Sequence, residues 1–176
     1  FNIPVDNLFA IPTIAHSWRG KFGSEEVVAV SPDAGGVERT RSFAKRIEST
    51  MAIIDKRRTA PNEAKALSLI GDVRGKIAVI IDDMVDTAGT LTQAVDSLYK
   101  NGAKRVFAVA THPVLSGPAI ERLIASPIEK LWVTDTIPLS EAAKNCGKIE
   151  VITVAPLLGE TIKRIHGNDS VSSLFD

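Results

Sequence analysis

A run of nine residues, Asp82-Asp83-Met84-Val85-Asp86-Thr87-Ala88-Gly89-Thr90, combines side chains that could bind a sugar phosphate. The run follows an apolar stretch, Ile77 to Ile81, and its last residues open a helical pattern. Free backbone N–H groups and the positive end of the helix dipole favour an anion at a helix start. Gly89 lets the backbone approach a phosphate closely, and the threonines add hydroxyl donors. The expected phosphate-binding residues are therefore Asp86, Thr87, Ala88, Gly89 and Thr90.

Asp82 and Asp83, at the other end of the run, cannot be phosphate ligands because both are negatively charged. Their oxygens are suited to accept hydrogen bonds from vicinal hydroxyls, or to hold a divalent cation. Phosphate donors at one end and hydroxyl acceptors at the other describe a sugar-phosphate site. The alternative is a solvated strand end with Thr90 as a simple helix cap. An Asp-Asp pair alone would favour that alternative, but the complete run favours the site.

Two further polar clusters also follow short apolar runs. Pro32 to Gly36 comes after Val27 to Val30, and Asp55 to Arg58 comes after Met51 to Ile54. In an open α/β sheet, ligands bind outside the carboxyl ends of the strands. Three such clusters at one sheet edge predict a single site.

Each of these clusters has a plainer interpretation. Asp33 is a candidate metal ligand, but a turn residue in Pro-Asp-Ala-Gly-Gly is a serious rival. A charge run at a strand end is ordinarily solvated, and Arg57 is expected to be so. Arg39 and Arg41, near the start of the next helix, are expected to be exposed helix residues rather than ligands.

Apolar runs without polar alternation indicate strands that are buried on both faces. Helical patterns lie between them, with apolar residues at i, i+3, i+4 and i+7. This alternation predicts right-handed βαβ units in an open, mainly parallel sheet with helices on both faces. The expected strands are Val27 to Val30, Met51 to Ile54, Ile77 to Ile81, Val106 to Ala110, Leu131 to Val133 and Val151 to Val154. The expected helical faces are Leu91, Ala94, Val95 and Leu98; Ile120, Leu123 and Ile124; and Leu158, Ile162 and Ile165.

Some helix ends can be predicted as well. Gly102 suits the left-handed cap of the helix that begins near Thr90. Ser116 is expected to cap the next helix, with Pro118 in its first turn. Residues 1–23 fit the alternating scheme poorly, and we expect them at the sheet edge or at a junction with a neighbouring domain.

The composition excludes several classes of function. With 21 Lys and Arg against 21 Asp and Glu, the formal net charge is +0, which gives no support to a general nucleic-acid surface. Cys146 is the single cysteine, so an intrachain disulfide or a cysteine metal cage is excluded. No apolar run approaches the ~20 residues that span a bilayer. The 176 residues suffice for one domain, 1–176.

The nine-residue run closely resembles the phosphoribosyl pyrophosphate motif of type I phosphoribosyltransferase folds, in the form found in ribose-phosphate pyrophosphokinases. Other stretches resemble the same family, and together they cover essentially the whole chain. The resemblance is to the second, carboxyl-terminal half of that family's two-domain subunit. These stretches are Phe1 to Leu8, Val30 to Gly36, Ile53 to Arg58 and Ser170 to Phe175.

The resemblance implies transfer of the diphosphoryl group of ATP to the C1 hydroxyl of ribose 5-phosphate. It implies Lys56 and Arg58 as catalytic residues on a flexible loop, with Arg58 also contacting substrate. Asp82, with Asp83 beside it, would contact the ribose, and Asp33 would bind Mg²⁺. It also implies a cytoplasmic enzyme whose subunits form dimers grouped into hexamers, with no nucleic-acid or membrane partner.

The chain departs from the family pattern at Thr59 to Asn62, where a basic contact is absent. The histidine metal ligand and much of the ATP surface belong to the family's first half, and His16, His112 and His166 are expected to be structural. We therefore expect this fragment alone to be inactive. Ser170 to Phe175 resembles part of an allosteric phosphate or ADP site, with a polar tail as the equal alternative. A phosphoribosyltransferase and a non-catalytic regulatory subunit are the rival functions.

Overall fold

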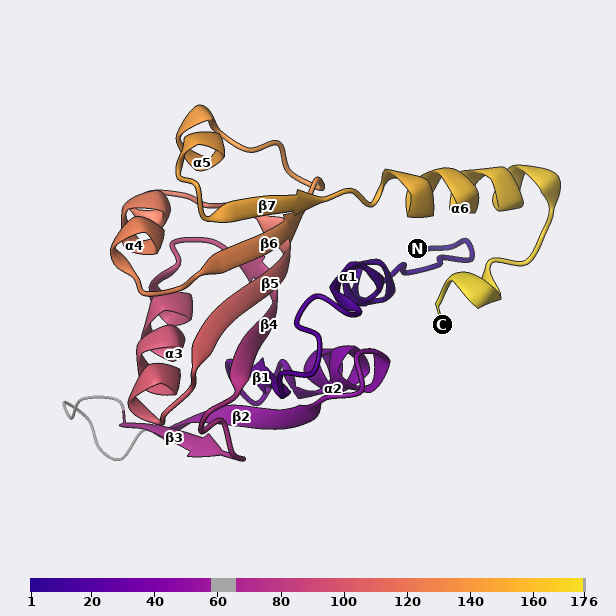
Figure 1. Ribbon diagram of the computed structural model, residues 1–176. Coiled ribbons are helices and arrows are strands. Elements are labelled where there is room, and N and C mark those ends of the chain that lie inside the picture. The colour runs from indigo at the N-terminus through magenta and orange to yellow at the C-terminus, as the bar shows by residue number, and fades with distance from the viewer. Residues whose placement is uncertain (58–65, 176) are drawn as a thin grey trace.

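The structure, a computed structural model, describes residues 1–57 and 66–175. Within these residues a seven-stranded sheet has the order β3-β2-β1-β4-β5-β6-β7 (Figure 1). All neighbouring strands are parallel except β2 and β3, which are antiparallel. The strands are β1 (Val27–Ser31), β2 (Thr50–Arg57), β3 (Ala66–Ile70), β4 (Ile77–Val85), β5 (Arg105–Pro113), β6 (Lys130–Thr134) and β7 (Ile149–Ile152).

Helices cover both faces of this sheet: α1 and α2 lie on one face, and α3 and α4 on the other (Figure 1). This arrangement confirms the predicted α/β fold. The helices are α1 (Ile11–Trp18), α2 (Val37–Arg46), α3 (Gly89–Lys100), α4 (Ala119–Ala125), α5 (Glu141–Asn145) and α6 (Ala155–Gly167), followed by a 3-10 turn, η1 (Ser172–Leu174). Among the described residues, none of the helices has the length and apolar character of a bilayer span.

The strands contribute side chains to two cores because successive residues of a strand point to opposite faces. In β1, Val28 and Val30 pack on the face of α3 and α4, whereas Ala29 packs on the face of α1 and α2. All three are fully buried, which explains the apolar run without alternation. The predicted face of α3 (Leu91, Ala94, Val95 and Leu98) is buried in the first core, as expected.

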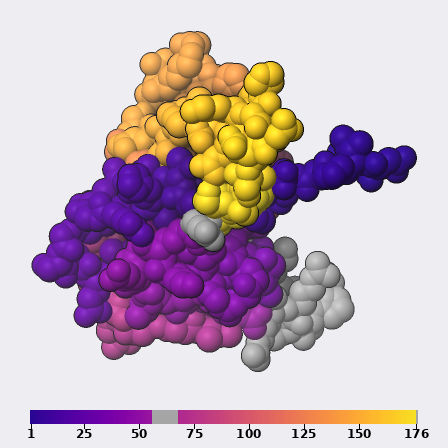
Figure 2. All heavy atoms as spheres, turned by 90° about the vertical axis from the view of Figure 1, so that its right-hand side faces the viewer, coloured from indigo at the N-terminus to yellow at the C-terminus, as the bar shows by residue number. Residues whose placement is uncertain are grey.

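The amino-terminal segment lies on a face of the sheet rather than at the sheet edge, which was one of its two expected positions, and a junction with a neighbouring domain stays a prediction. Part of it forms α1, which packs on a face of the sheet beside α2. Trp18 is the anchor: it is 3% exposed, and its ring lies 4.6 Å from that of Trp132 and 5.9 Å from that of Phe43. Figure 2 shows the first residues extending away from the rest of the molecule, and Phe1 is fully exposed.

Two predicted helix features were wrong. Ser116 does not cap α4, which begins at Ala119 without a side-chain cap. The expected apolar face of α6 is exposed: Leu158, Ile162 and Ile165 are 48%, 68% and 58% accessible. After β7 this helix projects away from the sheet instead of packing on it (Figure 1). The left-handed Gly102 at the end of α3, with φ of 89°, is as predicted.

Candidate functional site

The sheet topology creates a binding position between β1 and β4. The chain proceeds from β1 to β2 on one side of the sheet and from β4 to β5 on the other, so the order of strands reverses between β1 and β4. The helices that follow these two strands therefore lie on opposite faces, and their loops diverge to leave a crevice. A pocket of ≈ 380 Å³ lies here, lined by Asp33 and by the residues from Asp82 to Leu91.

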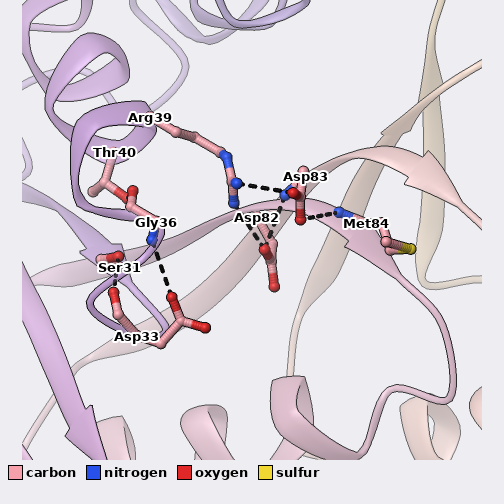
Figure 3. Close-up of polar contacts among 8 residues, drawn as sticks. All are labelled: Ser31, Asp33, Gly36, Arg39, Thr40, Asp82, Asp83 and Met84. Atoms are coloured by element: carbon pink, nitrogen blue, oxygen red, sulfur yellow. Dashed lines mark hydrogen bonds and ion pairs between the residues drawn. The ribbon is translucent and has the colours of Figure 1, made fainter.

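The loop after β1 is a tight turn. The buried Ser31 hydroxyl donates to the Asp33 carbonyl oxygen at 2.6 Å, and the Gly36 N–H donates to Asp33 Oδ1 at 3.0 Å (Figure 3). Gly36 is needed because a Cβ at that position would lie 2.8 Å from Ser31 Oγ. Asp33 thus has the turn role that we considered as a rival to metal binding. Its carboxylate also lines the pocket, so the turn leaves a second role open.

The acidic pair lies on a strand rather than in a loop. The sequence predicts a strand that ends at Ile81, but β4 continues to Val85. Its pairing with β5 extends through Asp82 opposite Ala110 and Val85 opposite Pro113. Backbone N–H groups orient both carboxylates: the Asp83 N–H donates to Asp82 Oδ1, and the Met84 N–H donates to Asp83 Oδ1, each at 2.9 Å.

Arg39 joins this site, contrary to our expectation that it is an exposed helix residue. From the first turns of α2, its Nη1 donates to Asp82 Oδ1 and its Nη2 to Asp83 Oδ2, both at 2.9 Å (Figure 3). Arg41 is exposed as expected, and it pairs with Glu38 on the same helix. The contacts of Arg39 span 43 and 44 positions in the sequence, so no local pattern could have predicted them.

The two carboxyl groups differ in electrostatics. Burial and the neighbouring Asp83 carboxyl together raise the pKa of Asp82 to about 6, against the opposing charge of Arg39. Burial acts on Asp83 in the same direction, but its interaction with the neighbouring Asp82 carboxyl and the charge of Arg39 outweigh burial, so the pKa of Asp83 is lowered. Asp83 therefore retains its charge to lower pH, and Asp82 is the group that takes up a proton first.

The expected phosphate cradle, Asp86 to Thr90, connects β4 to α3. Helix α3 begins at Gly89, and the left-handed residue that turns the chain into it is Ala88, with φ of 59°. Within the described part of the chain, the backbone N–H groups of Ala88, Gly89 and Thr90 donate to no acceptor. They are the orphan donors of a helix start, and the three residues line the pocket.

Ser116, which precedes α4, and Arg122, within α4, hold this loop in place, and no local sequence pattern indicates either contact. The Ser116 hydroxyl donates to the Asp86 carboxylate, and Arg122 Nη1 donates to the Thr87 carbonyl oxygen at 2.9 Å. A Cβ on Gly89 would lie 3.2 Å from Arg122 Nη1, so the glycine also makes room for this arginine.

The remaining predicted residues are only partly placed. Lys56 lies on β2, opposite Leu67 of β3, so its backbone belongs to a strand and not to a free loop. Arg58 lies outside the described residues, as do residues 59–62. The three histidines are absent from the pocket lining. In the described part of the chain, no three Asp, Glu, His or Cys side chains gather to form a complete metal cage.

The pocket therefore offers unpaired N–H donors at one end and carboxylate oxygens at the other. The donors suit a phosphate, and the oxygens suit hydroxyl groups or a cation. The structure places Asp33 beside the predicted sugar-phosphate residues, and it adds Arg39, Ser116 and Arg122 as their supports.

Comparison with known proteins gives consistent matches. Residues 56–176 match the family model of the phosphoribosyl synthetase-associated domain. The chain is 52% identical over 177 residues to a ribose-phosphate pyrophosphokinase of Xanthomonas axonopodis pv. citri, covering 99% of this chain and 55% of that protein. It is 54% identical over 176 residues to one of Bordetella pertussis, covering 99% of this chain and 56% of that protein. The chain thus spans about half the length of these curated relatives.

Solved structures show the same fold. The crystal structure of phosphoribosylpyrophosphate synthetase from Mycobacterium smegmatis matches with a TM-score of 0.87 and 36% identity, over 96% of this chain and 54% of that chain. A hypoxanthine-guanine phosphoribosyltransferase from Bacillus anthracis matches with a TM-score of 0.50 and 15% identity, over 63% of this chain and 75% of that chain. The second similarity shows the fold alone.

Proposed function

The chain belongs to the family of phosphoribosyl synthetase-associated domains, and we propose that it is the sugar-phosphate-binding part of a ribose-phosphate pyrophosphokinase. The observation that carries the proposal is the convergence on one pocket of Asp33, the acidic pair and the orphan N–H groups of the Asp86 to Thr90 loop. These groups lie in the order that ribose 5-phosphate requires, with phosphate donors at the helix start and hydroxyl acceptors on the strand.

In the proposed reaction the C1 hydroxyl oxygen of ribose 5-phosphate attacks the β-phosphorus of ATP. The bond between the β-phosphorus and the oxygen that bridges it to the α-phosphate breaks, AMP leaves, and the hydroxyl proton is released. The Asp86 to Thr90 loop holds the 5-phosphate, while Asp82 and Asp83 orient the ribose through its hydroxyls. Fixing the sugar in this way lowers the barrier because the reacting oxygen is already positioned.

Charge on the transferred group must be neutralised, and we assign this role to Lys56, Arg58 and Mg²⁺. One oxygen of Asp33 accepts the Gly36 N–H, and the other has no hydrogen bond among the described residues, so Asp33 fits a hard cation as one carboxylate ligand. Phosphate oxygens and water would complete the shell, as is usual for Mg²⁺. When bound, the ion would withdraw charge from the phosphoryl oxygens.

The remainder of the activity depends on parts that these 176 residues do not supply. The curated relatives are almost twice as long as the chain, and we assign adenine binding to the additional length. We accordingly propose one phosphoribosyltransferase-like domain, residues 1–176, that acts within a larger cytoplasmic subunit. We propose dimers grouped into hexamers as its assembly.

Calorimetric titration of the chain with ribose 5-phosphate, alongside an assay for AMP release from ATP, tests the proposal. We expect ribose 5-phosphate to bind and AMP release to be absent until the full-length subunit is used. Soaked crystals should show the 5-phosphate at the Asp86 to Thr90 loop. A phosphate bound elsewhere, with this loop empty, would refute the proposal.

A further inference from the structure

Arg39 contacts both members of the acidic pair with one planar guanidinium group. Its two Nη atoms each donate at 2.9 Å, one to Asp82 and one to Asp83 (Figure 3). A guanidinium more commonly places both donors on a single carboxylate. Here the guanidinium group of Arg39 instead connects two neighbouring carboxylates, so it fixes the position of each carboxylate relative to the other.

The hydrogen bonds of the pair leave one carboxylate oxygen without a partner. Asp83 Oδ1 accepts the Met84 N–H, and Asp83 Oδ2 accepts from Arg39. Asp82 Oδ1 accepts from Arg39 and from the Asp83 N–H. Asp82 Oδ2 has no hydrogen bond among the described residues, and Figure 3 shows it pointing away from Arg39. Since Asp82 lines the pocket, this oxygen is available to a hydroxyl group of a ligand.

We propose that Arg39 is a positioning residue that selects for ribose by holding the acidic pair so that a free oxygen of Asp82 meets the sugar hydroxyls. The inference rests on the proposed function, which supplies the sugar phosphate, and it goes further by assigning hydroxyl recognition to a residue that does not touch the substrate. Arg39 acts through Asp82, and the Asp86 to Thr90 loop acts independently on the phosphate.

The charges of the pair explain why such a residue is needed. Adjacent carboxylates repel each other, and without a cation between them the two side chains would rotate apart or share a proton. Arg39 lies in the first turns of α2. The start of this helix is held beside the end of β1, because the Gly36 N–H donates to Asp33 and the Thr40 hydroxyl donates to the Gly36 carbonyl oxygen. Its side chain is 26% exposed, so the cation is partly shielded from solvent. A lysine could neutralise the charge, but its single nitrogen lacks the planar pair of donor groups that fixes one carboxylate relative to the other.

The role predicts a specific effect on hydroxyl recognition. The chain should bind ribose 5-phosphate more tightly than 2-deoxyribose 5-phosphate, by roughly tenfold for a hydroxyl that donates to a carboxylate. Arg39→Gln should abolish most of this preference, and Arg39→Lys should do the same. Affinity for inorganic phosphate, which contacts the loop alone, should change less than about twofold.

The experiment is calorimetric titration of the 176-residue chain and its variants with the two sugar phosphates. Binding of inorganic phosphate is followed in parallel by the NMR shifts of the Gly89 and Thr90 amides. Arg41→Gln is the matched control, because Arg41 lies on the same helix but, among residues 1–57 and 66–175, pairs with Glu38 alone. This variant should retain the full preference for ribose 5-phosphate.

The outcomes separate this inference from the proposed function. If the unmodified chain prefers ribose 5-phosphate and Arg39→Gln and Arg39→Lys keep that preference, Arg39 does not position the pair and the inference is overturned while the function stands. If the unmodified chain binds neither sugar phosphate, the proposed function fails and the inference fails with it. Unchanged phosphate binding in Arg39→Gln shows that the variant is folded, so a lost preference then supports the inference.

Discussion

Gly36→Ala should destabilise the protein because the turn after β1 has no room for a side chain at this position. The added Cβ would lie 2.8 Å from Ser31 Oγ, closer than real Cβ atoms approach an oxygen. Ser31 is fully buried, and its hydroxyl donates to the Asp33 carbonyl oxygen at 2.6 Å. The hydroxyl must therefore rotate away and lose this bond, or the loop must shift.

The size of the effect follows from the less costly of these two responses. Rotation leaves a buried donor and acceptor unsatisfied, which costs about 1–3 kcal/mol, and movement of a packed loop costs a similar amount. We therefore expect the free energy of unfolding to fall by about 1–3 kcal/mol. In a chain of this length, each kcal/mol corresponds to a fall in Tm of roughly 2–4 °C. Ribose 5-phosphate affinity should also fall, because the same loop places Asp33 at the pocket.

A double-mutant cycle measured by urea denaturation isolates the contact. The Ser31→Ala variant lacks the Oγ atom that the new Cβ would meet, so in this background Gly36→Ala should cost less than about 0.5 kcal/mol. The coupling energy should therefore be about 0.5 kcal/mol or more. Gly35→Ala is the control, because a Cβ there would meet Asp33 Oδ1 at 3.4 Å, an ordinary van der Waals contact. An equal cost of Gly36→Ala in both backgrounds would show that the contact with Ser31 is not the cause.

Three further predictions concern the site. The raised pKa of Asp82 means that its carboxylate is charged above pH of about 6 and protonated below it, so ribose 5-phosphate affinity should decrease as pH falls through 6. The measurement is the affinity for ribose 5-phosphate at a series of pH values, with inorganic phosphate as the reference for ionisation of the ligand's phosphate. An Asp82→Asn variant with the same pH dependence would contradict the prediction. Arg122→Ala removes the donor to the Thr87 carbonyl oxygen, so phosphate affinity should weaken by roughly tenfold while the circular dichroism spectrum stays unchanged. Unchanged phosphate affinity would show that the loop keeps its shape without Arg122. In the full-length subunit, Lys56→Ala should lower turnover by about 100-fold or more with little effect on ribose 5-phosphate affinity, and Arg57→Ala should leave turnover near its original value.

The central strands and the loop that connects β4 to α3 could be predicted because their signals are local. Val28, Ala29 and Val30 are all apolar since both faces of β1 are covered, and this pattern can be read without knowing what covers them. The run from Asp82 to Thr90 likewise combines a strand end and a helix start within a few residues. The loop of a parallel strand emerges at the carboxyl edge of the sheet, so its position follows from the order of elements.

Other elements could not be predicted because their partners decide them. The apolar residues of α6 have the spacing of a buried face, yet they are exposed, since helical spacing shows that a face exists and does not show what it packs on. The amino-terminal residues gave no clear pattern, and α1 is held by Trp18 against rings from α2, β5 and β6. The edge strand β3 depends on its antiparallel pairing with β2.

The sequence by itself determined the α/β class, the order of the central elements and the groups that we propose to face the ligand. Only the tertiary structure decided how those groups are held, through Arg39 on the acidic pair and through Ser116 and Arg122 on the phosphate loop. These contacts join residues 30 to 44 positions apart. A ligand-binding residue is recognisable from its neighbours in the chain because strand, loop and helix follow one another directly. A supporting residue reaches the site from another element, so its role exists only after the sheet has brought β1, β4 and β5, with the helices that follow them, together.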